Sequence, residues 1–343
     1  MSMKSTESQT SMQVSVVNGT EKFGLGVIGL GIVGRRTIEH ALAQGSFHIA
    51  GAWDIDELAS QRLTGEQQHV PIAPSADAVI HNPATQVVYV ATPPQYHKPY
   101  VLAALKAGKH VLCEKPLSVD VADSRAMVQA AIAATGLNAV NFVFASTAAG
   151  DYAALALQNG SLGKLVGAEI RLHLTQWPRS WQADATWLRY REQGGFTREV
   201  LSHYVYLTER LFGASRLVAA STSYPSDPQL CESHVIAKLV CNGIPVHVVA
   251  EVGGGEVDTV NFTLWGSKTS LRFVDWYRLQ TNDGGGWVDA LGGSEDLPAL
   301  RQNAYSSQLA HLAQLLRGQP HSFPDFAAAL SVQEKIEAIL AAG

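Results

Sequence analysis

The stretch Leu25-Gly-Val-Ile-Gly-Leu-Gly-Ile-Val-Gly34 decides the fold of this 343-residue chain. It joins a short apolar run, Leu25 to Ile28, to a helical pattern from Ile32 to Ala43 through three glycines. The first glycine permits a tight turn, the second lets a pyrophosphate approach the backbone, and the third lets the helix pack closely on the strand. Because a helix N-terminus attracts phosphates, the pattern predicts a dinucleotide-binding loop. The predicted loop residues are Gly29, Gly31, Ile32, Val33 and Gly34.

An acidic residue, Asp54, follows the second apolar run, His48 to Trp53, at a distance typical of a ribose-binding carboxylate. A carboxylate there accepts hydrogen bonds from a free ribose 2′-hydroxyl and repels a 2′-phosphate, so NAD(H) is the favoured cofactor. NADP(H) stays open as an alternative, because Arg62 lies downstream and can reach a phosphate if Asp54 rotates away. The plainer interpretation of Asp54 is a solvated turn before a helix.

The first half of the chain alternates apolar runs with helical patterns, which is typical of βαβ units and a parallel sheet. Two of the helices are expected over Tyr96 to Ala107 and Val119 to Thr135, each with start and stop signals. We therefore expect an N-terminal doubly wound, parallel-sheet Rossmann domain over residues 22–146. Its expected strands are Leu25–Ile28, His48–Trp53, Val87–Ala91, His110–Cys113 and Ala139–Phe144.

The second half, residues 147–343, has a different pattern, in which several strands follow one another without helices between them. This predicts a C-terminal α/β domain with a large open, mainly antiparallel sheet. One helix is expected from about Phe196 to Phe212, and the last forty or so residues are predicted to form helices that pack back on the first domain. The expected strands are Val166–Thr175, Arg216–Tyr224, His234–Val240, Pro245–Val252, Asn261–Trp265 and Ser270–Tyr277.

Composition and charge argue against several classes of protein. A net charge of −5 gives no broad cationic surface for nucleic acid or an anionic membrane, which favours a protein that acts on a small molecule. No stretch has the roughly 20 apolar residues that cross a bilayer. Residues 1–21 are polar and are predicted to form a flexible tail without an export signal. The 3 cysteines are an odd number, which favours a reduced, cytoplasmic setting, and no metal site is predicted.

The tripeptide Glu114-Lys115-Pro116 is the strongest candidate for chemistry. It directly follows an apolar run that ends at Cys113, so the lysine is expected at the carboxyl edge of a parallel sheet, where ligands bind. The proline fixes the backbone behind it. The competing interpretation is an ordinary surface lysine that pairs with Glu114.

Two further blocks, together with the glycine loop, carry a family resemblance. They are Val90-Ala-Thr-Pro-Pro-Gln-Tyr-His97 and Ala107-Gly-Lys-His-Val-Leu-Cys-Glu-Lys-Pro116. With them, nearly all of the chain resembles the glucose-fructose oxidoreductase and inositol 2-dehydrogenase family, Gfo/Idh/MocA. The resemblance implies NAD(P)-dependent oxidation or reduction of a hydroxyl or keto carbon on sugars, cyclitols and their relatives. It also implies homodimers or homotetramers formed through the open sheet, and further cofactor-binding residues, which are Ala91, Thr92, Pro93, His97, Glu114 and Lys115.

The segment Gly194-Gly-Phe-Thr-Arg-Glu-Val-Leu-Ser-His203 is similar to the family's second-domain motif, with Glu199 in place of the usual aspartate. The resemblance implies that His203 is the catalytic acid and base and that Lys115 hydrogen-bonds the reacting oxygen. Glu199 lies four residues before His203 and shares its helical face, so it is expected to orient His203 or to bind a substrate hydroxyl. A buried core histidine and a structural ion pair between Glu199 and a nearby arginine are the plainer alternatives.

The run Trp177-Pro-Arg-Ser-Trp181 is expected to face the substrate, because aromatic faces suit sugar rings and arginine suits carboxylates or phosphates. Core packing and solvated charge explain the run equally well. Tyr206 stands where the family often has an aspartate, and it either donates a hydrogen bond or simply packs. The predicted substrate residues are therefore Trp177, Arg179, Trp181 and Tyr206.

Two functions other than a simple dehydrogenase or reductase stay open. One is an NAD-dependent glycosidase of the same architecture, which removes a hydride transiently, eliminates the sugar substituent and returns the hydride. The other is a non-catalytic NAD(P)-binding regulatory protein, because a fold can outlast its chemistry. The first predicts sugar release without net NADH formation, and the second predicts binding without turnover.

Overall fold

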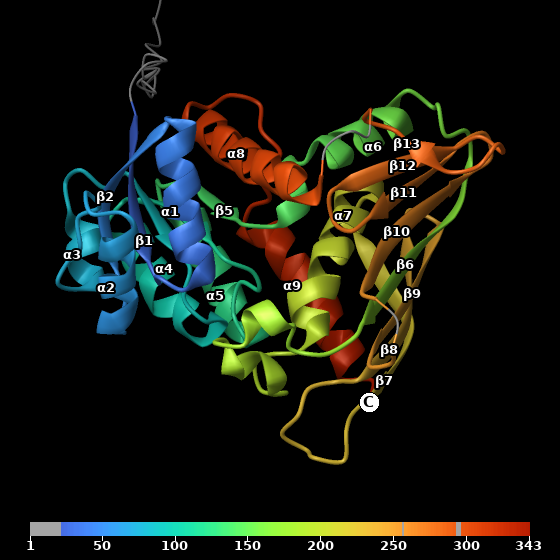
Figure 1. Ribbon diagram of the computed structural model, residues 1–343, viewed down its shortest axis with the longest axis horizontal. Coiled ribbons are helices and arrows are strands. Elements are labelled where there is room, and N and C mark those ends of the chain that lie inside the picture. The colour runs from blue at the N-terminus through green and yellow to red at the C-terminus, as the bar shows by residue number, and fades with distance from the viewer. Residues whose placement is uncertain (1–21, 256, 293–295) are drawn as a thin grey trace, which may run out of the picture.

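The computed structural model describes residues 22–255, 257–292 and 296–343, which are built around two sheets (Figure 1). The flexible tail predicted for residues 1–21 lies outside these residues. The first sheet has five parallel strands in the order β2-β1-β3-β4-β5, so the winding direction reverses between β1 and β3. This confirms the predicted Rossmann fold. The strands are β1 (Phe23–Ile28), β2 (Phe47–Trp53), β3 (Val87–Val90), β4 (His110–Cys113) and β5 (Asn138–Val140).

The helices of this half differ in how they begin. The side chains of Asp56, Ser75 and Asp120 each accept a hydrogen bond from a backbone N–H at the start of α2, α3 and α5. In contrast, α1 begins at Gly31 with no side-chain cap. Its first N–H groups are therefore left for a ligand or for water. The helices are α1 (Ile32–Gln44), α2 (Glu57–Glu66), α3 (Ala76–His81), the short 3₁₀ turn Pro94–Tyr96, α4 (His97–Lys106) and α5 (Val121–Ala133).

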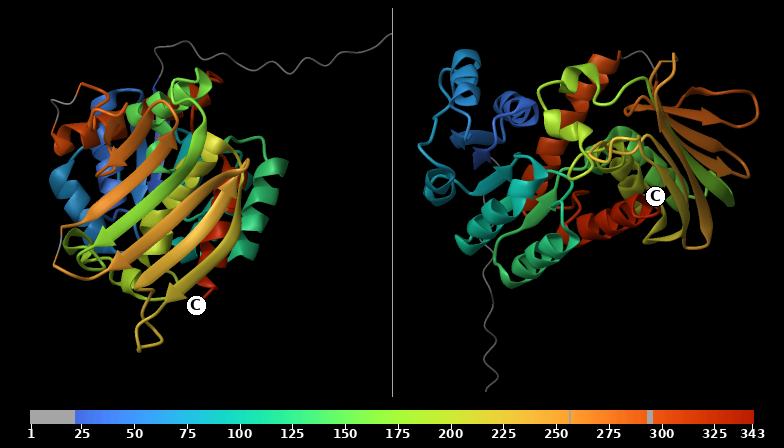
Figure 2. Two further views of the ribbon diagram at one scale, coloured as in Figure 1. Left: turned by 90° about the vertical axis from the view of Figure 1, so that its right-hand side faces the viewer. Right: turned by 90° about the horizontal axis from the view of Figure 1, so that it is seen from below.

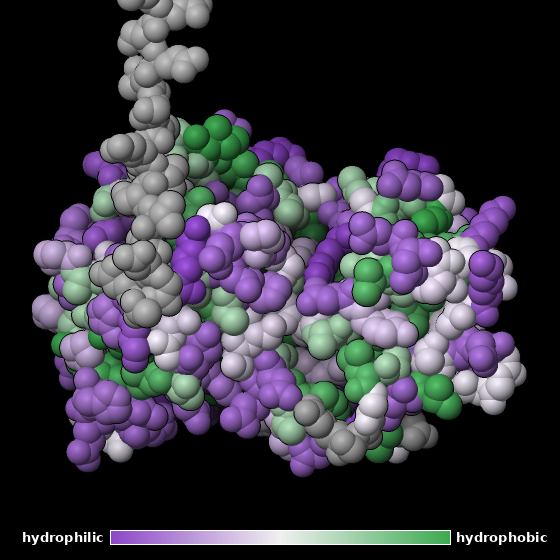
Figure 3. All heavy atoms as spheres, turned by 90° about the horizontal axis from the view of Figure 1, so that it is seen from above, coloured by the Kyte–Doolittle hydropathy of each residue, from purple (hydrophilic) through white to green (hydrophobic). Residues whose placement is uncertain are grey.

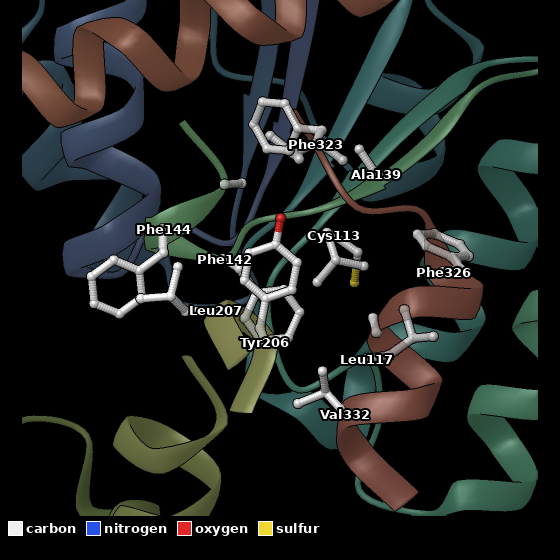
Figure 4. Close-up of a cluster of buried hydrophobic side chains, with 14 of the residues drawn as sticks. Cys113, Leu117, Ala139, Phe142, Phe144, Tyr206, Leu207, Phe323, Phe326 and Val332 are labelled. Atoms are coloured by element: carbon white, nitrogen blue, oxygen red, sulfur yellow. The ribbon is translucent and has the colours of Figure 1, made fainter. Parts of the chain in front are cut away.

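The strand predicted over Ala139–Phe144 is too long, because β5 ends at Val140. The backbone N–H of Phe142 then bonds back to the carbonyl of Val140 at 3.0 Å, and the chain enters a 3₁₀ turn, Val143–Ser146. Phe142 and Phe144 are fully buried at the junction with the second half (Figure 4). Their apolar side chains therefore fill this junction, and do not extend the sheet.

The second sheet has eight strands in the order β13-β12-β11-β10-β6-β9-β8-β7. Within the described strands of this second sheet, only β6 and β9 pair in parallel, so the predicted mainly antiparallel sheet is confirmed. Helices cover one face of this sheet, and the other face is open (Figure 2). The strands are β6 (Leu165–Leu174), β7 (Ser215–Ser223), β8 (His234–Cys241), β9 (Ile244–Val252), β10 (Thr259–Gly266), β11 (Ser270–Val274), β12 (Arg278–Asn282) and β13 (Val288–Asp289).

Two elements of the second half depart from the sequence prediction. The expected strand Ser270–Tyr277 breaks after Val274, because Asp275 and Trp276 turn the chain with φ angles of 49° and 74°. The expected helix Phe196–Phe212 begins with a π-helical turn, Thr197–Leu201, before regular α-helix α7 (Ser202–Phe212). Such turns are rare and occur frequently at functional sites.

The C-terminal helices lie between the two sheets in the view of Figure 1. Helix α8 (Leu297–Leu316) contacts α1, and α9 (Phe326–Leu340) contacts α5. The Ser124 hydroxyl donates to Gln333 Oε1 at 2.6 Å, so a buried polar bond links α5 to α9. The remaining short elements are α6 (Ala148–Gln158) and the 3₁₀ turns Ser180–Gln182 and Thr186–Arg189.

Candidate active site

The glycine loop has the geometry that a pyrophosphate site needs. Gly29 has a φ of 102°, and a Cβ atom on it would lie 2.6 Å from the backbone of Ala91. A Cβ on Gly34 would lie 2.0 Å from the carbonyl oxygen of Gly29, so helix and strand pack at a distance that only glycine allows. Gly31 is different, because a Cβ there would meet nothing within 4 Å. The space above Gly31, at the uncapped start of α1, fits a bound phosphate group.

Asp54 fixes this loop to the end of β2. Its Oδ2 accepts the backbone N–H of Leu30 at 2.6 Å, and its Oδ1 accepts the backbone N–H of Asp56 at 2.9 Å. The carboxylate thus lies directly beside the loop, in the place expected of a ribose ligand. Arg62 is exposed on α2.

His97 holds two strand ends of the same sheet edge together. The ring is fully buried, with Nε2 lying 2.8 Å from the Thr92 carbonyl and Nδ1 lying 3.0 Å from the Pro116 carbonyl. Burial lowers the pKa of His97. The imidazole therefore supports the backbone segments after β3 and β4, which contain Ala91, Thr92, Pro93, Glu114 and Lys115.

Glu114 and Lys115 point to different partners. The Glu114 carboxylate accepts hydrogen bonds from the Tyr89 hydroxyl and from Asn141 Nδ2, the latter at 2.7 Å. Burial raises the pKa of Glu114. Lys115 is only 8% exposed and pairs with Glu199, so it is not the surface partner of Glu114 that the plainer interpretation assumes.

The π-helical turn at the start of α7 forms the second half of this lysine site. Lys115 Nζ donates to the backbone carbonyl of Glu199 at 3.0 Å and also to the Glu199 carboxylate. The neighbouring arginines are paired elsewhere: Arg198 makes two 2.7 Å bonds to Glu337, and Arg210 binds Asp151. The arrangement brings Lys115, from the end of β4, against the turn that precedes His203.

His203 lies deep in the same region and is 7% exposed. Its ring meets Phe142 and Trp276 edge-on, with centroids 5.6 Å and 5.5 Å away. Burial, followed by the charges of Lys115 and Arg179, lowers the pKa of His203 well below 6.5. Nδ1 accepts the backbone N–H of Val143 at 3.3 Å, so the neutral ring carries its proton on Nε2.

The predicted substrate residues divide into two groups. Trp177, Arg179 and Trp181 lie together, because the Arg179 guanidinium stacks over both indoles. Tyr206 lies apart from them at the junction of the two halves, stacked on Phe142 at 4.6 Å, and its hydroxyl donates to the Ser322 carbonyl at 3.2 Å (Figure 4). This geometry favours the packing interpretation of Tyr206.

Two residues near the site were not singled out from the sequence. Trp276 packs beside His203 from the tip of the β11–β12 hairpin, and its positive φ is costly for a bulky residue. Glu232 is buried and accepts the backbone N–H of Thr197 at 2.7 Å, so it caps the π-helical turn. The sequence does carry a signal for Trp276: it is a tryptophan between two strand patterns, at a position where a hairpin turn usually has glycine or asparagine. No local signal marks Glu232.

Comparison with known families settles the relationship that these features indicate. Residues 23–142 match the Gfo/Idh/MocA model described as an oxidoreductase family with an NAD-binding Rossmann fold, and residues 155–342 match the C-terminal α/β domain model of the same family. This chain belongs to the Gfo/Idh/MocA oxidoreductase family. The predicted family and its nicotinamide cofactor class are thereby confirmed.

Individual relatives match over shorter regions. The chain is 30% identical over 149 residues to a 1,5-anhydro-D-fructose reductase of Ensifer adhaerens, covering 41% of this chain and 44% of that protein. It is 38% identical over 112 residues to an inositol 2-dehydrogenase of Pseudomonas fluorescens, covering 32% of this chain and 33% of that protein. The chain thus spans less than half the length of these relatives. A levoglucosan dehydrogenase solved with NADH and levoglucosan has the same fold, with a TM-score of 0.80 at 20% identity over 94% of this chain and 97% of that chain.

The described residues also bear on membrane insertion and metal binding. No helix among them is long and apolar enough to cross a membrane. They contain no group of three or more histidine, cysteine, aspartate or glutamate side chains that could hold a metal ion.

Polar side chains cover most of the face seen from above, with apolar ones scattered between them (Figure 3).

Proposed function

We propose that this protein is an NAD(H)-dependent dehydrogenase or reductase that acts on a hydroxyl or keto carbon of a sugar, cyclitol or related polyhydroxy substrate. The observation that carries the proposal is the position of Lys115. Its ammonium lies at the sheet edge that also carries the glycine loop, and it is held by Glu199, four residues before His203. Groups that bind a nucleotide thereby meet groups that can exchange a proton with a substrate oxygen.

The cofactor contacts in this proposal come from the first half of the chain. The free N–H groups at the start of α1, in Gly31, Ile32 and Val33, bind the pyrophosphate, and Asp54 binds the ribose. Ala91, Thr92 and Pro93 form the adjacent wall, and NADP(H) is the secondary cofactor. When bound, the nicotinamide supplies or accepts the hydride.

His203 serves the reaction as a hydrogen-bond donor. With Nδ1 accepting the Val143 N–H, the neutral ring presents Nε2–H, which has no other partner among the described residues. The role implied by the family resemblance, in which neutral His203 accepts the hydroxyl proton, requires the opposite tautomer, and the Val143 N–H disfavours it. His203 therefore stabilises negative charge on the reacting oxygen.

Lys115 carries the exchanged proton in this mechanism. Two of its three N–H bonds are directed to Glu199, which leaves the third for the substrate oxygen. In reduction, the ammonium gives its proton to the oxygen as the carbon receives hydride. In oxidation, the neutral amine takes the hydroxyl proton as hydride leaves the carbon. Glu199 thus positions Lys115, and not His203.

A substrate screen tests the function. Polyols, aldoses, uronates and their keto forms are incubated with NAD⁺ or NADH, and cofactor absorbance and sugar release are followed together. Steady turnover of cofactor by the protein, with little turnover by Lys115→Met, is the expected result. Sugar release without net NADH formation would instead show the glycosidase, and tight NAD(H) binding with no turnover on any compound would show a regulatory protein.

We also propose a cytoplasmic homo-oligomer that assembles through the open face of the second sheet. Apolar side chains are exposed on several strands of that sheet, including Val166 on β6, Ile236 on β8 and Trp265 on β10. The three cysteines are buried and unpaired, as suits a reducing compartment.

A further inference from the structure

Arg179 lies within a group of indole rings. Its guanidinium carbon is 5.7 Å from the ring centroid of Trp177, 4.9 Å from that of Trp181 and 5.9 Å from that of Trp276. These rings come from the loop after β6 and from the β11–β12 hairpin. Stacking on aromatic faces fixes a planar guanidinium while leaving its edge free for hydrogen bonds.

The edge of this guanidinium is only partly used. Nε donates to Gln182 Oε1 at 3.0 Å, which fixes the direction of the fork. The two terminal nitrogens make no hydrogen bond or ion pair with any other described residue, although burial is strong enough to lower the pKa of Arg179. The side chain is half-buried, and its terminal nitrogens are not among the sealed polar atoms that lack a partner, so they are open to an anion that arrives from solution.

The Arg179 guanidinium lies in the same region of the molecule as Lys115 and His203. Trp276 contacts both Arg179 and His203, and the charge of Arg179 is one cause of the lowered His203 pKa. The charge of Glu199 in turn acts on Arg179. A ligand bound to Arg179 therefore lies beside the groups assigned to proton transfer.

The charged groups around Arg179 define what kind of anion fits. Lys115 and Glu199 neutralise each other. The other carboxylate that acts on Arg179 is Asp258, which accepts the Thr175 N–H and hydroxyl, both at 2.8 Å, and makes no ion pair with Arg179. Asp258 keeps its negative charge, so these four groups have no surplus positive charge; what remains unused is the pair of terminal N–H donors of Arg179, whose spacing matches a planar monovalent carboxylate in bidentate geometry. A phosphate dianion would need a second cation.

We propose that Arg179 binds a carboxylate of the substrate, so that the preferred substrate is a sugar acid such as a hexuronate. This inference rests on the proposed oxidoreductase function. In the productive complex, the carboxylate lies on the free edge of Arg179, and the reacting hydroxyl or keto carbon lies between Lys115 and His203.

The test compares matched ligands on matched variants. Glucuronate and galacturonate are compared with glucose and galactose, and with glucose 6-phosphate, in the presence of NAD⁺ and at constant ionic strength. Binding is followed by tryptophan fluorescence, because three indoles surround Arg179, and turnover is followed by cofactor absorbance. Acetate is the minimal carboxylate probe. The variants are Arg179→Gln, Arg179→Lys and the control Arg191→Gln, which removes an arginine stacked on Tyr224 at 3.7 Å.

The expected result is saturable binding of a uronate, or of acetate, with at least 10-fold preference over the neutral sugar. Arg179→Gln should lower this preference about 10- to 100-fold, Arg179→Lys should restore part of it, and Arg191→Gln should leave it unchanged. An unchanged preference in Arg179→Gln, no carboxylate-specific fluorescence change, or a preference for glucose 6-phosphate would each overturn the carboxylate site.

The two readouts separate this inference from the proposed function. Carboxylate binding that depends on Arg179, without any cofactor turnover, would support the carboxylate site and reject the proposed oxidoreductase function. Turnover of neutral sugars, without a preference for uronates that depends on Arg179, would support the proposed oxidoreductase function and reject the carboxylate site.

Discussion

The two halves of the molecule build their parts of the site in different ways. In the first half, the nucleotide loop is made from consecutive residues whose backbone is the binding surface, and glycines are essential because any side chain would occupy the required space. In the second half, side chains from distant segments meet: Arg179 and Trp276 lie almost one hundred residues apart in sequence. The cofactor end is thus fixed by local sequence, and the substrate end by tertiary packing.

Lys115 is the residue where the two halves meet, so its removal should have the largest effect. Lys115→Met keeps most of the apolar volume and removes the ammonium that faces Glu199. We expect kcat to fall about 10²- to 10³-fold, with NAD(H) affinity changed only slightly. Steady-state kinetics and a cofactor titration measure the two quantities. Lys98→Met, which breaks a partly exposed ion pair with Asp123, is the control and should retain activity. Normal turnover in Lys115→Met would place the chemistry elsewhere.

Most of the fold could be predicted from the sequence, since hydrophobic periodicity and glycine punctuation are local signals. The errors lie at the junction of the two halves. The apolar run through Phe142 and Phe144 has the composition of a strand, but tertiary packing uses it to fill the space beneath α7 and α8. The hairpin tip at Trp276 was missed for a related reason, because a positive φ at tryptophan is imposed by its surroundings and not by its own preference.

The candidate site shows the same division. The glycine loop and Asp54 lie where their spacing indicates, because a strand, a turn and a helix fix them locally. Helical spacing alone places Glu199 near His203 and cannot show that Lys115 reaches the turn from the first half of the chain, so the pairing of Lys115 with Glu199 is not predictable from the sequence. The tautomer of His203 likewise depends on Val143, which is 60 residues away in the chain.

Substitution of His203 distinguishes a hydrogen-bond donor from a proton acceptor. A glutamine amide can replace an Nε2–H donor in approximately the same position but cannot act as a base. We expect His203→Ala to lose about 100-fold in kcat, and His203→Gln to recover to within about 10-fold of the unaltered protein. Steady-state kinetics measure both, and unchanged NAD(H) affinity shows that the first half is intact. Equal losses in the two variants would return the proton-accepting role to His203.

The glycine loop offers a matched pair of substitutions that separates folding from binding. A Cβ on Gly31 meets no protein atom, so Gly31→Ala should leave the free energy of unfolding nearly unchanged and weaken NAD(H) binding at least 10-fold by occupying the phosphate space. Gly34→Ala should instead lower the free energy of unfolding by about 2–3 kcal/mol, because its Cβ would overlap the Gly29 carbonyl. Chemical denaturation and calorimetric titration measure the two effects. Gly65→Ala on α2 is the control, since its Cβ also meets nothing within 4 Å. Full NAD(H) affinity in Gly31→Ala would remove the loop from the proposed site.

The smallest predicted effect is a shift in the titration of His203, and it tests whether the substrate end acts as one electrostatic unit. Burial and the charges of Lys115 and Arg179 lower the pKa of His203 well below 6.5, so the ring should stay neutral when ordinary histidines become protonated. Because the folded state holds this group neutral, the stability it contributes is present above pH 6.5 and is lost as the pH falls through the lowered pKa. Arg179→Gln removes one of the three causes, and the His203 pKa should therefore rise, while staying below 6.5 because burial and Lys115 remain. NMR titration of the 12 histidine rings, with His203→Gln to assign the signal, measures the shift. Arg191→Gln should leave the His203 pKa unchanged. An equal rise in that variant would show that the charge of Arg179 does not act specifically on His203.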